Sequence, residues 1–169
     1  DSSRMHFFLS EALDVSINDV ESFVLGGHGD DMVPLVNYTT IGGIPLIDFL
    51  KIKKIPVSKI QKIVDRTRMG GGEIVKLLKR GSAFYAPASS AIQMAEAYLF
   101  NQKKLLPCAA YLNGQYGLKS MYMGVPTIIG SKGIEKIIEV RLSASEKTML
   151  KKSVKSVQGL VSAVEKILK

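Results

Sequence analysis

A histidine flanked by glycines is the residue of this chain best suited to transfer a proton near neutral pH. His28 lies in the sequence GGHGDD, which spans Gly26–Asp31 and follows the apolar run VESFVL. Imidazole is the side chain whose ordinary titration falls within the physiological range. Glycines on both sides permit a sharp turn and leave room for a ligand against the ring. We therefore expect His28 to be an acid/base residue, positioned by the end of a strand.

A carboxylate and a guanidinium lie three residues apart at the start of the chain. Asp1 and Arg4 share one face of a predicted helix. One interpretation is a salt bridge at the end of that helix. In the other, the glycine turn faces the start of the helix, and Asp1 accepts a hydrogen bond from one ring nitrogen of His28. Arg4 then binds a substrate carboxylate through its planar fork.

The remaining reactive side chains favour structural roles. His6 lies one turn into an amphipathic helix, and we expect it to support the fold. Cys108, the only cysteine, lies among apolar neighbours in LLPCAAYL, which predicts a buried side chain. A single cysteine excludes an internal disulfide and favours a reducing compartment, so we expect a cytoplasmic protein. No zinc-ligand pattern occurs, and we expect no metal.

The composition suits one globular domain, because 46% of the 169 residues are hydrophobic. The net charge of +8 raises the possibility of a nucleic-acid partner. The lysines, however, are separated by apolar residues at helical spacing, as on solvated helix faces, and we expect no nucleic-acid partner. No apolar stretch approaches the roughly 20 residues of a membrane-spanning helix, and the first residues lack the layout of a signal peptide. We therefore expect a soluble protein with no membrane partner.

A helix and two extended segments are predicted before residue 50. Apolar positions at spacings of three and four predict a helix over residues 2–13. Residues 20–25 resemble a strand, and residues 32–46 a second extended stretch broken by Gly42-Gly43. These elements would support the start of the chain and lead into the His28 turn.

A glycine-rich helix follows. Ser58 and Gln61 form a capping-box pair at its start, and Gly70-Gly71-Gly72 interrupts its apolar pattern. Three glycines inside a helix each cost about 1 kcal/mol relative to alanine. They indicate either a plain break between two helices, or a kink or close approach by substrate or another chain.

The second half combines helices with antiparallel strands. Residues 87–101 form a helix with Pro87 in its first turn, and strands follow over 105–112, 120–130 and 133–142. The final helix opens with a capping box of Ser143 and Glu146, and its apolar stripe is expected to bury against a sheet or a partner helix. The fold class is therefore α+β, with largely antiparallel strands packed with long helices over residues 1–169.

Several long motifs resemble one enzyme family in order along the whole chain. They are DSSR, VLGGHGDDMVPL, IGGIPLIDF, GGGEIVKLLKRGSAFYAPASSA, LPCAAYLNGQYG and GVPTIIGSKGIEKIIEV. As a set they resemble the C-terminal, substrate-binding half of a malate dehydrogenase of the lactate-dehydrogenase-like type. The resemblance implies an oxidoreductase of the tricarboxylic acid cycle that interconverts malate and oxaloacetate with NAD.

The resemblance also assigns roles to individual residues. It makes His28 the proton donor and acceptor, Asp1 its orienting carboxylate and Arg4 the clamp on the C1 carboxylate of substrate. GSAFYAPAS matches the segment that lines the substrate pocket and nicotinamide, so Ala83 and Pro87 are expected pocket residues, with Pro87 and His28 beside the cofactor. The family also implies a homo-oligomer, either a dimer or a tetramer.

The nucleotide-binding half of such an enzyme is missing from this sequence. No Gly-x-Gly-x-x-Gly fingerprint occurs, and the chain opens at Asp1, inside a catalytic motif. We therefore expect a fragment that needs an N-terminal dinucleotide-binding half, the main binding surface for NAD, and that is inactive alone. Two alternatives remain open: a lactate dehydrogenase-type half, and an assembly or interaction domain without independent catalysis.

Overall fold

The computed structural model describes residues 1–168, which divide into two compact units. The first unit comprises Asp1–Val24 and Pro34–Ile92. The second comprises Leu25–Val33 and the chain from Gln93 onward. Asp1, Arg4, Ala83 and Pro87 thus belong to the first unit, and His28 belongs to the second. We describe each unit by itself.

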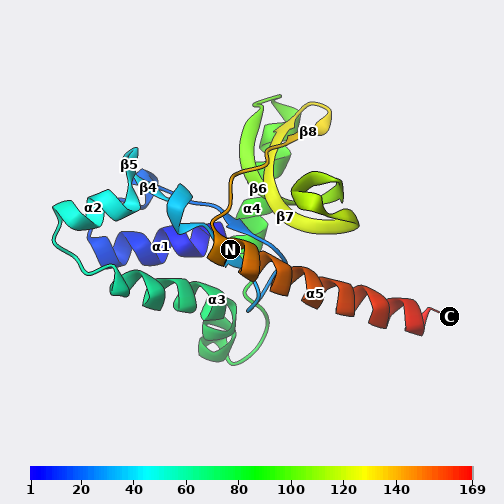
Figure 1. Cartoon of the computed structure of the whole chain (residues 1–169), viewed down its shortest axis with the longest axis horizontal. Coiled ribbons are helices and arrows are strands. Elements are labelled where there is room, and N and C mark those ends of the chain that lie inside the picture. The colour runs from blue at the N-terminus through cyan, green and yellow to red at the C-terminus, as the bar shows by residue number, and fades with distance from the viewer. Residues whose placement is uncertain (169) are drawn as a thin grey trace. The chain divides into compact units, whose positions relative to one another are not determined.

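Two helices packed side by side form the centre of the first unit (Figure 1). Helix α1, Ser2–Leu13, buries the predicted stripe of Met5, Phe8, Leu9 and Leu13. Helix α3, Ser58–Leu78, contributes a matching face at the same three-to-four spacing. Its buried residues are Ile60, Ile63, Val64, Thr67 and Gly70. The helix periodicity of both segments is therefore confirmed.

Helix α3 differs from the sequence prediction at its start and its middle. Ser58 is inside the helix, the N-cap is Val57, and no side chain caps it, so the predicted capping box is wrong. The turn forms instead through the backbone, where Lys59 N donates to Pro56 O and Ile60 N to Val57 O. The helix continues through all three glycines, so a plain break between two helices is also wrong.

The extended segments of the first unit are shorter than predicted. Residues 20–25 form two short strands, β1 (Val20–Glu21) and β2 (Val24–Leu25), because Ser22 N donates to His6 Nε2 instead of to a neighbouring strand. The same bond, 3.1 Å long, gives His6 the structural role expected of it. Burial is the main cause that lowers the pKa of His6.

The second extended segment contains three strands and a hairpin. They are β3 (Val33–Pro34), β4 (Thr40–Ile41) and β5 (Ile44–Pro45). The sheets have the orders β1-β4-β5 and β2-β3. Gly42-Gly43 forms the β4–β5 turn with φ of 56° and 81°, values that favour glycine at both positions. Helix α2, Leu46–Ile52, follows directly and was not predicted.

An antiparallel sheet in the order β6-β7-β8 dominates the second unit. Its strands are β6 (Lys104–Asn113), β7 (Lys119–Gly130) and β8 (Gly133–Ile137). Burial alternates along β6, and Leu106 and Cys108 form a core cluster with Ala97 and Ile129. Cys108 is therefore buried as predicted, and burial raises the pKa of its thiol. The predicted third strand ends five residues early, because the Tyr116 hydroxyl binds the backbone of Ile138 and Val140.

The two remaining α-helices both have the first turn that the sequence predicts. Helix α4, Tyr85–Leu99, carries Pro87 in its first turn, as predicted. Helix α5, Ala144–Ile167, begins with the predicted capping box: Glu146 N donates to Ser143 Oγ, and Ser143 N donates to the Glu146 carboxylate. The predicted apolar stripe of α5 is buried at Leu150 and Val154, but Val161 and Val164 farther along it are 49% and 54% exposed. No helix within residues 1–168 has the length and apolar character needed to cross a membrane.

The fold class is confirmed: in the part of the chain that the structure describes, five α-helices combine with antiparallel sheets in an α+β arrangement.

Candidate active site

The His28 turn is fastened to the middle of strand β7. Gly26 N donates to Gly124 O at 2.9 Å, and Gly124 N donates to Gly26 O at 2.8 Å. A Cβ on Gly124 would lie 2.7 Å from Gly26 O, so a larger residue at position 124 would force the two backbones apart. Gly26 also has φ of 93°, a backbone angle that residues other than glycine rarely adopt. Two glycines distant in sequence therefore fix the start of this turn.

Helix α5 supplies a second anchor for the same turn. The buried hydroxyl of Ser153 accepts a hydrogen bond of 2.7 Å from Gly27 N. A Cβ on Gly27 would lie 2.8 Å from Val157 Cγ2, so this glycine is also required by packing. On the other side of His28, a Cβ on Gly29 would meet nothing within 4 Å. The glycines before His28 serve close packing, and only the one after it borders open space.

Asp1 and Arg4 form the ion pair that the sequence offered as one interpretation. Arg4 Nη1 donates to Asp1 Oδ1 at 3.1 Å, and the Arg4 side chain is only 10% exposed. The Nε atom of Arg4 is buried and has no hydrogen-bond partner among the described residues. A buried guanidinium donor that is left unpaired is costly, so this atom calls for an acceptor from outside the described chain. The salt bridge thus uses only part of the guanidinium.

The glycines of α3 form the surface on which Arg4 lies. A Cβ on Gly70 would lie 3.1 Å from Arg4 Cδ and 3.3 Å from Phe8 Cε2. A Cβ on Gly71 would lie 3.4 Å from both Nη atoms of Arg4, whereas one on Gly72 would meet nothing within 4 Å. A close approach to these glycines is therefore found, but the approaching group is an arginine of this chain and not the substrate or second chain that was predicted.

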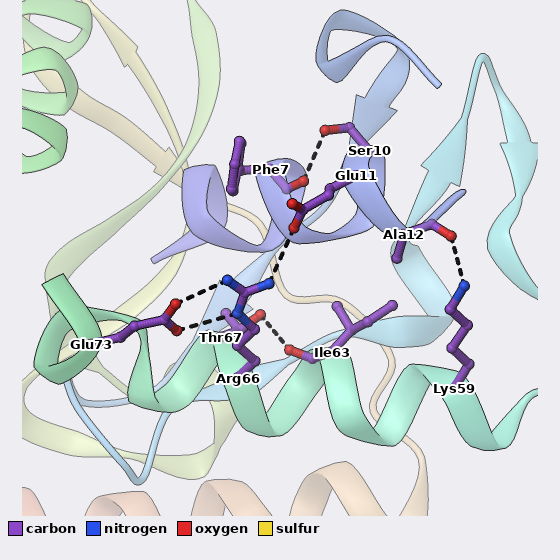
Figure 2. Close-up of polar contacts among 9 residues, drawn as sticks. All are labelled: Phe7, Ser10, Glu11, Ala12, Lys59, Ile63, Arg66, Thr67 and Glu73. Atoms are coloured by element: carbon purple, nitrogen blue, oxygen red, sulfur yellow. Dashed lines mark hydrogen bonds and ion pairs between the residues drawn. The ribbon is translucent and has the colours of Figure 1, made fainter. Parts of the chain in front are cut away.

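A second arginine on the same two helices has a complete set of partners. Arg66 of α3 binds Glu73 at 2.9 Å through Nη2 and Glu11 of α1 at 3.1 Å through Nη1 (Figure 2). Its Cζ atom also lies 4.2 Å from the centroid of the Phe8 ring. The hydrogen bonds to Glu73 are the main cause that raises the pKa of Arg66. Arg66 therefore joins α1 to α3 at the surface.

The two expected pocket residues lie just before and within the first turn of α4. Ala83 is half-buried in the segment that leads to the helix, and Pro87 is exposed in its first turn. Phe84 and Tyr85 between them have ring centroids 4.9 Å apart and are both exposed. This segment belongs to the same unit as Asp1 and Arg4, and within that unit the structure pairs Asp1 with Arg4.

Two supporting residues were not predicted from the sequence. They are Gly124 and Ser153, which hold the His28 turn. Signals for them existed. Gly124 interrupts a strand, which often marks a close backbone approach. Ser153 is a polar residue directly beside the apolar stripe of a helix, and such a residue needs a partner once buried.

Comparisons with known proteins identify the family of this chain. The family of the lactate/malate dehydrogenase, alpha/beta C-terminal domain, matches residues 1–168. The malate dehydrogenase of Cryptosporidium parvum is 51% identical, with a TM-score of 0.95 over 98% of this chain and 52% of that one. The chain belongs to the lactate/malate dehydrogenase family.

Further solved structures come from both branches of this family. Lactate dehydrogenase from Eimeria maxima, solved with NADH and oxamate, is 46% identical, with a TM-score of 0.94 over 98% of this chain and 52% of that one. Malate dehydrogenase from Salinibacter ruber is 45% identical, with a TM-score of 0.91 over the same shares. This chain therefore spans about half the length of these dehydrogenases and corresponds to their C-terminal domain.

Proposed function

We propose that this chain is the substrate-binding half of an NAD-dependent malate dehydrogenase. The observation that carries the proposal is the buried Nε atom of Arg4, which has no hydrogen-bond partner within residues 1–168, beside an ion pair from the same guanidinium to Asp1. An anionic substrate would supply the missing acceptor, and a carboxylate matches the planar donor arrangement of a guanidinium. Membership of the dehydrogenase family supports a 2-hydroxy acid as that carboxylate.

Each residue then has a distinct role in the proposed reaction. Arg4 binds the C1 carboxylate of malate, which orients the substrate. His28 accepts the proton of the C2 hydroxyl during oxidation and returns it during reduction of oxaloacetate. Asp1 accepts a hydrogen bond from the other ring nitrogen, which fixes the tautomer and stabilises the protonated ring. Ala83 and Pro87 line the pocket, with Pro87 and His28 facing the nicotinamide.

This chain supplies only a small part of the cofactor site. When bound, NAD accepts the hydride that leaves C2 of malate. The glycine-rich fingerprint that binds a dinucleotide does not occur in the sequence, and Gly70–Gly72 lies inside α3 instead of after a strand. Gly70 and Gly71 pack against Arg4 instead. We therefore propose that an N-terminal half provides the main NAD surface.

Malate is preferred to lactate as the substrate for two reasons. The small side chain of Ala83 suits a dicarboxylate, and a malate dehydrogenase is 51% identical to this chain. Lactate dehydrogenase is the second candidate, because the enzyme from Eimeria maxima is 46% identical over the same half. The two candidates share the roles of His28, Asp1 and Arg4, so they differ only in the group bound opposite C1.

We test the proposal with the complete dehydrogenase, formed by this chain joined to a dinucleotide-binding half. NADH oxidation is followed with oxaloacetate and then with pyruvate, and we expect oxaloacetate to be the better substrate. His28→Asn should lower kcat by roughly a thousandfold, the usual scale of lost acid/base catalysis. His6→Asn is the matched control, because His6 binds only the Ser22 backbone, and it should retain kcat within about twofold.

Equal loss in the two histidine variants would contradict the role of His28. A preference for pyruvate would move the assignment to lactate dehydrogenase. We expect the chain alone to be inactive, so malate-dependent NADH production by it would contradict the need for a second half.

We further propose that the enzyme is a cytoplasmic homo-oligomer, in which the exposed half of the α5 stripe makes subunit contacts. A concentration-independent monomer in light scattering would contradict that assembly.

A further inference from the structure

A groove of about 690 Å³ runs along helix α5 in the second unit. One side is formed by α5 itself, from Lys147 to Gln158. The other side is formed by the turn at Tyr116–Leu118 and by the segment Val140–Leu142. This volume lies within the range of specific ligand sites. The proposed function assigns nothing to it, and all of its lining belongs to the second unit.

The groove combines an apolar lining with a row of positive charges. Lys147, Lys151 and Lys155 line it from α5, and Arg141 lines it from the opposite side. No acidic residue lines it among the described residues. The nearest carboxylates in sequence are already used, because Glu139 accepts from Tyr116 N and Glu146 completes the α5 capping box. An anionic occupant is therefore favoured electrostatically.

The spacing of the lysines distinguishes between kinds of anion. Lys147, Lys151 and Lys155 follow each other at intervals of four residues, so they are about 6 Å apart along the helix axis. A ligand with one charged group would use only one of them. In an extended peptide, alternate side chains point the same way and repeat every 6.6 Å or so. Acidic side chains at alternate positions therefore match this lysine row in register.

Apolar groups line the side of the groove to which the intervening side chains of such a peptide would point. Leu118 and Tyr116 lie on that side, opposite α5. Leu150 and Val154 lie between the lysines on α5 and, at 7% and 9% exposed, offer little surface to a ligand. Because successive side chains of a strand point to opposite faces, acidic residues can face α5 while apolar ones face Leu118.

We propose that this groove is a docking site for an extended peptide segment of a partner protein in which acidic and apolar residues alternate. Acidic side chains pair with Lys147, Lys151 and Lys155, and apolar side chains pack against Tyr116 and Leu118. The site is independent of the proposed dehydrogenase reaction.

The test is peptide binding to the 169-residue chain, measured by fluorescence anisotropy. The probe is a labelled peptide of about seven residues in which glutamate alternates with leucine. A peptide of the same composition with the glutamates in one block controls for general charge attraction. We expect saturable binding of the alternating peptide, with an affinity at least about fivefold above that of the block peptide.

Paired variants locate the site on α5. Lys151→Glu should weaken the alternating peptide by about fivefold or more, because it reverses the central charge of the row. Lys166→Glu makes the same charge change on an exposed residue of the same helix outside the groove, and should alter binding by less than about twofold. Leu118→Ala should also weaken the peptide, since it removes apolar contact area. Far-UV circular dichroism checks that each variant is folded.

Three outcomes would overturn the proposal. The first is equal affinity for the alternating and block peptides, and the second is equal weakening by the two lysine variants. The third is binding of decanoate or of a nucleoside triphosphate with no peptide binding, which would assign the groove to a small anion.

Discussion

Arg4 and Arg66 both lie between helices α1 and α3, yet they are used in opposite ways. Arg66 binds two carboxylates and the Phe8 ring and is 45% exposed (Figure 2). Arg4 is 10% exposed and binds the Asp1 carboxylate at 3.1 Å, and its buried Nε atom has no hydrogen-bond partner in the described part of the chain. The guanidinium of Arg66 is therefore fully hydrogen-bonded at the surface, whereas the buried guanidinium of Arg4 has a donor with no acceptor among the described residues.

The difference separates a structural arginine from one suited to a ligand. A buried donor without an acceptor is unfavourable, so a protein keeps one only where another requirement outweighs its cost. The glycines of α3 strengthen this interpretation. Glycine has low helix propensity, but only glycine at positions 70 and 71 leaves full room for the Arg4 side chain against the helix. Arg66 lies four residues before Gly70 on the same helix, and none of the α3 glycines packs against its side chain. The following predictions test that contrast.

Conservative replacement of the two arginines should give the largest contrast. In the complete dehydrogenase, Arg4→Lys should lower kcat/KM by roughly 100-fold, because lysine cannot form the two parallel hydrogen bonds of a guanidinium. Arg66→Lys should change kcat/KM by less than about twofold, since its partners are surface carboxylates. Steady-state kinetics with oxaloacetate measures both. Near-normal activity of Arg4→Lys would reduce Arg4 to a salt-bridge residue.

Substitutions in the α3 glycines should give an intermediate effect. Gly70→Ala places a methyl group 3.1 Å from Arg4 Cδ, which must shift, and we expect kcat/KM to fall about tenfold. Gly72→Ala is the matched control, because a Cβ there meets nothing within 4 Å. It should preserve activity and raise the free energy of unfolding by up to about 1 kcal/mol through better helix propensity. Urea denaturation measures the second quantity, and equal kinetics for the two variants would refute the seating of Arg4.

Loss of the Arg66 ion pairs should give the smallest effect, visible only in stability. The hydrogen bonds from Arg66 are the main cause that lowers the pKa of Glu73 below its ordinary 4.5. Because the folded pKa is depressed, this stabilisation is fully present above about pH 4.5 and is lost as the pH falls through the folded value. Arg66→Gln should therefore be slightly less stable than the parent at pH 7 and low salt. The gap should close at acidic pH and in 1 M salt.

Thermal unfolding measured across pH and salt tests this last prediction. A gap that persists at acidic pH or in 1 M salt would indicate that Arg66 acts mainly through packing on Phe8 instead.

The parts of the fold that could be predicted depend on local signals. The α1 stripe and the α5 capping box follow from spacings of a few residues, and both are confirmed. The strand predicted over 20–25 was divided by a bond from Ser22 to His6, sixteen residues away. Long-range bonds of this kind leave no periodic trace in the sequence.

The candidate site shows the same division. The sequence identified His28, Asp1 and Arg4 by the chemistry of their side chains, and their joint role remains a prediction. It left the glycines of α3 open between a break and a close approach, because only the packed structure shows Arg4 against Gly70. It missed Ser153 and Gly124, which carry no reactive group and act only by holding a backbone in place.

The anchoring of the His28 turn also sets when the acid/base residue can take its place. Gly26 is joined to Gly124, and Gly27 to Ser153, which follows it by 126 residues. Contacts of such long sequence separation form late, because a large loop must close first. On the ribosome, the second anchor of the histidine turn cannot form until Ser153 of helix α5 has emerged. Nascent chains that stop between Gly124 and Ser153 would hold this turn through Gly124 alone, so the acid/base residue is fully fixed more than 120 residues after it is synthesised.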